Sequence, residues 1–294
     1  CNSRLGELGK AGVSYASGGN TEFPGYINVL QMDVSVLGAV DVTVPNDPTA
    51  DPKLGDGRPQ LAVPWTVKLL PHIDRQGLLE QLQTNNGQPI NSPTPGFDGR
   101  RSGDPVPGNP FDNPPSIETF LCPSDTAAGA AGRLTYVMNT GYYDGFDVNM
   151  TQTRVDYIAN GLGFDQRRPD KLVVRNGTAD VKDGASMTLM FSENVHKDEV
   201  PDSGGNAYAT WMGPTNLASN PEQRFGFTWV NSDAPTIGTN PWVAPFNSDL
   251  GATDFSSQEA RFARPGSAHP ELFIVAFADS HNRTIRDTID YRVY

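Results

Sequence analysis

The first residues of the chain include apolar side chains that would form a stripe along one side of a helix. Its members follow one another at spacings of three and four, as on one face of an α-helix: Leu5, Leu8, Ala11 and Tyr15. Gly6, Gly9 and Gly12 lie among them, and each costs a helix up to about 1 kcal/mol relative to alanine. Such a helix would hardly be stable alone. We therefore expect residues 2–15 to end a longer helix that packs closely on something flat.

A second helical pattern covers residues 69–82, with Pro71 near its start. The patterns typical of strands come only later. Apolar and polar residues alternate in three short stretches, which are centred near Tyr136, Leu189 and Phe227.

The last apolar run, residues 272–278, shows no alternation and is typical of a strand buried on both faces. A turn at Asp279 and Ser280 would lead to a final strand at 284–289. Helices come first and strands later, without regular βαβ alternation. This order favours an α+β domain with a mainly antiparallel sheet.

The chain length of 294 residues suits one large domain, and we expect residues 1–294 to form a single unit. Only 37% of the residues are hydrophobic, and 30 glycines and 25 prolines interrupt the regular patterns. Much of the interruption falls in residues 84–116 and 201–254, which we expect to be long, loop-rich insertions. Loops of this length are usually functional or disordered.

The formal net charge of −12, without a long run of Lys or Arg, argues against a nucleic-acid partner. No stretch approaches the roughly 18–20 apolar residues of a membrane span. The first residue is not Met, so we expect that a targeting or anchoring segment belongs upstream.

Six short motifs, in order along the chain, resemble those of one protein family: CNSRLGELGKAGVSYASGGNTEFPGY, WTVKLLPHIDRQGLLEQL, FLCPSD, RLTYVMNTG, VKDGASMTLMFSEN and RPGSAHPELFIVAFADS. The family is a large group of bacterial proteins of unknown function, abundant in planctomycetes. Its members have a prepilin-type N-terminal cleavage and methylation helix and a C-terminal His-x9-Asp-Gly signature. The motifs are spread over the whole sequence, and together they form a specific match.

The resemblance implies a type IV pilin-like fold, in which a truncated N-terminal helix packs on a mainly antiparallel sheet with long loop insertions. It also implies a pseudopilin-like structural or assembly protein of the bacterial cell envelope, and not an enzyme. Its partners would be other pilin-like subunits or envelope proteins. The protein would be extracytoplasmic, and either anchored in the inner membrane through the missing helix or located at the cell surface or secreted. The alternative is an extracellular module that binds a sugar, a peptide or a metal ion.

The chain departs from the family signature at one position, where Ser280 follows Asp279 in place of glycine. Glycine tolerates a positive φ in a tight turn, and serine does so poorly. We therefore predict that Asn282 takes the left-handed position and lengthens the turn.

Cys1 and Cys122 are the only cysteines. In an oxidising compartment such a pair favours a disulfide, which could stabilise the fold by roughly 4–5 kcal/mol by closing a loop of about 120 residues. Two free thiols, or a lipid on Cys1, are the alternatives.

Glu193, His269 and Asp279 are polar residues of the family motifs. A histidine with carboxylates could bind a metal or perform acid–base chemistry, and a hydrolase built on these residues would need all three to converge. We favour structural roles, in which His269 holds a loop, Asp279 forms an Asx-turn and Glu193 pairs with an arginine such as Arg264.

No nucleophile elbow, phosphate-binding loop, dinucleotide fingerprint or zinc-type spacing is present in the sequence. We therefore assign no catalytic, cofactor-binding or metal-binding residue. Calcium remains possible in the acidic loops around Asp144, Asp147 and residues 198–202, although none has EF-hand spacing. Trp211, Trp229 and Trp242 could stack on sugars, but anchoring the core or a loop is the favoured role.

Overall fold

The computed structural model describes residues 1–20, 22–31, 60–84, 114–125, 132–142, 161–166, 177, 179–195, 210–212, 225–229 and 265–289, and every structural statement below concerns these residues. The helices are α1 (Asn2–Tyr15), the π-helical turn η1 (Ala16–Asn20), α3 (Trp65–Leu69), the 3₁₀ turn η2 (Leu70–Ile73), α4 (Gln76–Thr84) and the 3₁₀ turn η4 (Glu118–Phe120). The strands are β1 (Ile27–Gln31), β2 (Gln60–Pro64), β3 (Tyr136–Tyr142), β4 (Leu189–Glu193), β5 (Gly226–Trp229), β6 (Leu272–Phe277) and β7 (Asn282–Arg286).

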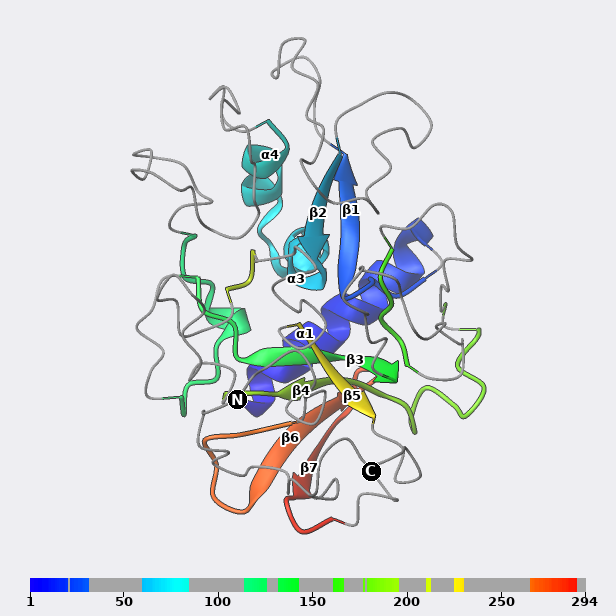
Figure 1. Cartoon of the computed structure of the whole chain (residues 1–294), viewed down its shortest axis with the longest axis vertical. Coiled ribbons are helices and arrows are strands. Elements are labelled where there is room, and N and C mark those ends of the chain that lie inside the picture. Colours follow the sequence, from blue (N-terminus) through cyan, green and yellow to red (C-terminus); the bar gives the residue numbers. More distant parts are fainter. Residues whose placement is uncertain are drawn as a thin grey trace, which may run out of the picture.

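A five-stranded sheet with the order β5-β3-β4-β6-β7 forms the centre of the fold (Figure 1). Its neighbouring strands are antiparallel, except that β3 and β5 are parallel. Strands β1 and β2 form a separate antiparallel pair. The predicted insertions at 84–116 and 201–254 lie mostly outside the described residues, and β5 is the one strand described within them.

Side chains on the two faces of the central sheet enter two different clusters, because successive residues of a strand point to opposite sides. One cluster lies on the side of α1 and includes Tyr136, Met138, Met190, Ile274 and Ala276. The other includes Val137, Leu189, Phe273, Val275 and Phe277. Strand β6 is thus buried on both faces, as its uninterrupted apolar run predicted.

Helix α1 runs obliquely across the sheet and contacts β4, β6 and β7 (Figure 1). The predicted stripe is its buried side, where Leu5 and Leu8 are fully buried and each contributes about 1.5–3 kcal/mol. A Cβ on Gly12 would lie only 2.8 Å from Met190 Sδ, and one on Gly9 would lie 3.3 Å from Ser280 Cα. The glycines that weaken the isolated helix therefore let its backbone approach the sheet closely.

The second predicted helix is broken into α3, η2 and α4. The break lies at Asp74, which has φ 59° and ends η2 in the left-handed conformation. Pro71 lies in the first turn of η2, where a missing N–H does no harm. The leucines keep helical spacing across this break, so the sequence pattern did not reveal the turn.

The turn between β6 and β7 corrects the prediction for Asn282. Ser280 itself has the positive φ, of 70°, and its N–H donates to Phe277 O at 2.8 Å. Asn282 instead begins β7, and its Nδ2 donates to Asn2 O at 2.8 Å. The turn is therefore short, and β7 is tied to the first residues of α1.

None of the helices in the ranges given above has both the length and the apolar character needed to cross a membrane.

The contact between α1 and the sheet gives a test by substitution. Gly12→Leu should destabilise the protein by about 1–3 kcal/mol, because the new side chain would overlap Met190 and Phe191. Gly77→Leu is the matched control, since a Cβ on this exposed glycine of α4 meets nothing within 4 Å. The control should gain up to about 1 kcal/mol of helix stability. Urea unfolding measures the free energy of unfolding of both variants. If Gly12→Leu were as stable as Gly77→Leu, α1 would not lie close to the sheet.

Candidate functional site

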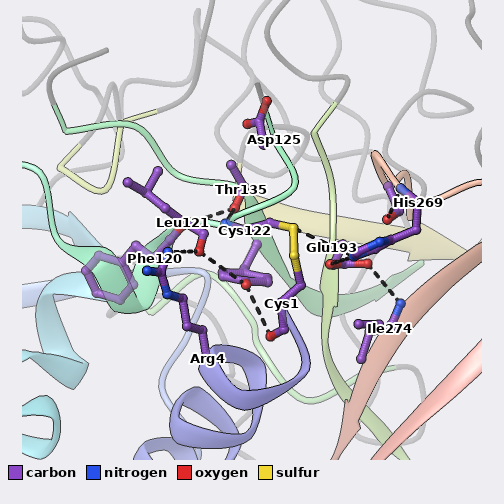
Figure 2. The surroundings of a disulfide bond; sticks show 12 residues. Cys1, Arg4, Phe120, Leu121, Cys122, Asp125, Thr135, Glu193, His269 and Ile274 are labelled. Carbon is purple, nitrogen blue, oxygen red and sulfur yellow. Dashed lines mark hydrogen bonds and ion pairs between the residues drawn. A yellow bond between two sulfur atoms is a disulfide. The ribbon is translucent and has the colours of Figure 1, made fainter. Parts of the chain in front are cut away.

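A disulfide joins the start of α1 to the segment after η4. Cys1 is the N-cap residue of α1, and its sulfur is bonded to that of Cys122. The Cα atoms are 4.6 Å apart, and the sequence separation is 121. Figure 2 shows the neighbouring contacts. Arg4 Nη1 donates to Leu121 O at 2.9 Å, and Cys122 N–H donates to Thr135 Oγ1 at 2.6 Å. The first turn of α1 is therefore fixed to the chain that leads into β3.

Glu193 ends β4 beside this disulfide, and its side chain is completely buried. Its Oε2 accepts a hydrogen bond from the backbone N–H of Ile274 in β6, at 3.0 Å. Its backbone carbonyl accepts one from Gly266 N–H at 2.9 Å. The residue thus fastens the segment before β6 to the end of β4.

His269 lies in that segment, and its Nε2 points toward both Glu193 and the disulfide (Figure 2). Nε2 is 3.5 Å from Glu193 Oε1 and 3.9 Å from Cys122 Sγ. The His269 backbone N–H donates to Ser267 Oγ at 3.0 Å, which fixes the local turn. Among the described residues, Glu193 Oε1 has no hydrogen-bond partner. The predicted partner Arg264 lies outside the described residues.

Burial raises the pKa of the Glu193 carboxyl above its ordinary value. Hydrogen bonds from Ile274 N–H and the Ser267 hydroxyl, and then the charge of His269, oppose that rise. Burial also raises the pKa of the neighbouring Tyr136 hydroxyl, and the Glu193 carboxylate adds to this effect. The site therefore disfavours negative charge unless a cation is close.

Asp279 does not join this group. It follows β6, whereas His269 precedes it, and a six-residue strand spans about 20 Å. Asp279 Oδ1 accepts the backbone N–H of His281 at 3.1 Å, which is an Asx-turn, and also contacts the His281 ring. A hydrolase that uses Glu193, His269 and Asp279 together is therefore inconsistent with the structure.

The structure places two of the three polar motif residues, Glu193 and His269, beside the two cysteines. One possible ligand atom from each of Cys1, Cys122, Glu193 and His269 lies within 4.8 Å of the others. In the sequence, the cysteines and the polar motif residues are separate features. A signal was present, because all four residues belong to the quoted motifs, but the motifs are too far apart in sequence to reveal the contact.

The remaining predicted sites are the acidic loops and the tryptophans. The acidic loops at Asp144, Asp147 and 198–202, and Trp242, lie outside the described residues. Trp211 is fully buried, and its ring N–H donates to Pro115 O at 2.8 Å. It anchors a loop in the core, as the favoured interpretation predicted.

A family model described as a protein of unknown function (DUF1559) matches residues 1–292. The chain belongs to the DUF1559 family. Both ends of the disulfide, Glu193 and His269 lie within the match. The prediction of a family of unknown function is confirmed, while the prepilin-type helix and the planctomycete origin stay predictions. No curated protein and no solved structure shows significant similarity to this DUF1559 chain.

The disulfide gives a second prediction. In oxidising buffer, the Cys1→Ser/Cys122→Ser variant should be less stable than the wild type by about 4–5 kcal/mol, because the unfolded chain regains the freedom of a long loop. Urea unfolding with and without reductant measures the difference. Reductant should destabilise the wild type and leave the double variant unchanged. Two reactive thiols in the native oxidised protein would contradict the disulfide.

Glu193 gives a prediction for pH dependence in the oxidised, metal-free protein. Because the folded-state pKa is raised above the ordinary 4.5, the native state binds the proton more tightly, and its stability falls as pH rises through the folded pKa. Glu193→Gln stays neutral and still accepts the Ile274 N–H. The variant should therefore gain stability relative to the wild type as pH rises above about 4.5.

Urea unfolding across this pH range measures the effect. Glu7→Gln, on the exposed side of α1, is the control and should keep the shape of the wild-type profile. A relative gain for Glu193→Gln that shrinks with rising pH would mean that the attraction of His269 outweighs burial.

Proposed function

We propose that this DUF1559 chain is the extracytoplasmic part of a pseudopilin-like structural protein of the bacterial cell envelope, and that it works in assembly and not as an enzyme. The observation that carries the proposal is the docking of α1 across a mainly antiparallel sheet. A helix packed on such a sheet is the arrangement that the resemblance to prepilin-type proteins implies.

Several contacts hold the start of α1 to the rest of the domain. The disulfide holds Cys1, and the Asn282 side chain holds the backbone carbonyl of Asn2. With its first turn fixed in this way, α1 can transmit position and force between the sheet domain and a helix that continues upstream. This is what an assembly subunit requires, because its helix and its globular part have to move as one body.

The outward side of α1 is polar and includes Asn2, Ser3, Glu7, Lys10 and Ser14. It leaves a surface where a neighbouring pilin-like subunit or another envelope protein could pack. A disulfide is also more compatible with an extracytoplasmic location than with a reducing cytosol. The net charge of −12 disfavours nucleic acid as a partner.

Photo-crosslinking in the full-length protein, expressed with its natural upstream sequence, tests the proposal. A photoreactive amino acid at Ser3 or Lys10 should form crosslinks to a second copy or to another prepilin-type protein. The matched control is Asp183, an exposed position in the turns that precede β4, and it should give none. Processing by a prepilin peptidase upstream of Cys1 should accompany assembly. A secretory signal that ends at Cys1, together with a monomer that forms no crosslinks, would contradict the proposal.

An extracellular ligand-binding module is the second candidate. The cluster of Cys1, Cys122, Glu193 and His269 favours it, and the name of the family model, SBP_bac_10, hints at a binding-protein role. Thermal stabilisation by a ligand would separate this function from assembly, because a ligand that binds only the native state raises its apparent stability.

A further inference from the structure

The end of β4 brings together four side chains that come from four different segments of the chain (Figure 2). We propose that, when the Cys1–Cys122 disulfide is reduced, Cys1, Cys122, Glu193 and His269 bind one divalent transition-metal ion of the Zn²⁺ type, and that reoxidation to the disulfide releases it. The inference specifies the ligand class of the second candidate function and does not depend on the assembly role.

The donor set suits such an ion. Two thiolates, one imidazole nitrogen and one carboxylate oxygen make a four-coordinate site of the kind that zinc prefers. Zinc–ligand bonds of about 2.0–2.3 Å place the ligand atoms of a tetrahedral site roughly 3.3–3.8 Å apart. His269 Nε2 is already 3.5 Å from Glu193 Oε1 and 3.9 Å from Cys122 Sγ. The other pairs of ligand atoms lie within 4.8 Å of each other, so binding needs small side-chain movements, and the two sulfur atoms have to separate, which reduction allows.

The surroundings of the Glu193 carboxyl group favour a bound cation. The Glu193 side chain is completely buried, Oε2 is held by Ile274 N–H, and the Ser267 hydroxyl also bonds to the carboxyl. Oε1 faces His269 Nε2 at 3.5 Å. A buried carboxylate is unfavourable unless a positive charge lies close to it, and a metal ion between Oε1 and Nε2 would supply that charge. The Ile274 contact is the type of outer hydrogen bond that orients metal-binding carboxylates.

The orientation of the His269 ring argues against a catalytic triad at this site. In a triad, one ring nitrogen faces the nucleophile and the other faces the acid. In this site a single nitrogen, Nε2, faces both Cys122 Sγ and Glu193 Oε1. The three groups therefore converge on a common point, as ligands do, and do not form a relay.

Reduction and reoxidation exchange two electrons and two protons at the Cys1–Cys122 bond. A dithiol reductant gives two electrons and two protons to the Cys1–Cys122 bond, which becomes two thiols, and the reductant becomes a disulfide. Metal binding then displaces both thiol protons into solvent. Oxidation by a disulfide compound reverses the sequence, because the sulfur atoms cannot be thiolate ligands while they are bonded to each other.

The test uses the 294-residue chain with at least one residue placed before Cys1, so that the Cys1 amino group is a peptide nitrogen and cannot bind the metal. The protein is reduced with a phosphine under anaerobic conditions and titrated with Co²⁺ and then Zn²⁺. The reduced wild type should bind one Co²⁺ per chain, with a thiolate-to-cobalt charge-transfer band and the intense visible bands of tetrahedral cobalt, and Zn²⁺ should displace it. The oxidised protein should show neither the charge-transfer band nor the visible bands of tetrahedral cobalt.

Matched histidine variants locate the site. His269→Asn should weaken Zn²⁺ binding by at least about tenfold, which is the loss that outer-shell partners alone already cause, and Glu193→Gln should do the same. His281→Asn changes a histidine at the opposite end of β6 and should leave the affinity unchanged. Equal losses in His269→Asn and His281→Asn would overturn the proposal, as would octahedral cobalt without a charge-transfer band.

Circular dichroism at each step separates folding from binding. If the reduced chain loses its structure, Zn²⁺ should restore it at one equivalent in the wild type and in His281→Asn, but not in His269→Asn. A reduced wild type that stays folded and binds no cobalt, or one that Zn²⁺ does not refold, would overturn the proposal. Either result would leave the crosslinking test of assembly unaffected.

Discussion

The close approach of α1 to the central sheet is the contact on which the rest of the structure depends. Glycine at positions 9 and 12 permits this approach, since a Cβ there would crowd Ser280 and Met190. The same glycines make α1 a weak helix in isolation, so the helix and the sheet stabilise each other. Burial of Leu5 and Leu8 supplies part of the free energy that compensates for the low helix propensity.

This contact also builds the candidate site. Because α1 lies across β4 and β6, its first residue reaches the end of β4, where Glu193 and His269 already meet. Cys122 comes from the segment after η4, and Thr135 holds its backbone N–H. If α1 were displaced, Cys1 would leave the cluster, and both the disulfide and the proposed metal site would be lost. The proposed assembly through α1 and the proposed metal binding at the reduced cysteines would therefore depend on the same contact between α1 and the sheet.

Much of the local structure followed from residue patterns. The apolar stripe predicted α1, and the uninterrupted run at 272–278 predicted a strand with two buried faces, because burial leaves a direct trace in hydrophobicity. Sequence patterns failed where the φ angle of a single residue decides the local structure. Asp74 breaks the second helix with φ 59°, and Ser280 adopts φ 70° where asparagine was expected two residues later. The pair β1–β2 had no prediction, because each strand has only five residues and residues 32–59 separate them in sequence.

The sequence by itself indicated the family, helix α1, the strands of the central sheet, and the two cysteines as the only possible disulfide. It missed β1 and β2, which precede α3 and α4, so the expected order of helices first and strands later was wrong. It did not determine which motif residues meet. Glu193 and His269 are 76 positions apart and come together because β4 and β6 pair side by side. Asp279 is only ten positions from His269, yet the extended strand β6 keeps them at opposite ends. Proximity in a sheet depends on strand pairing and not on distance along the chain, so only the tertiary structure could decide it.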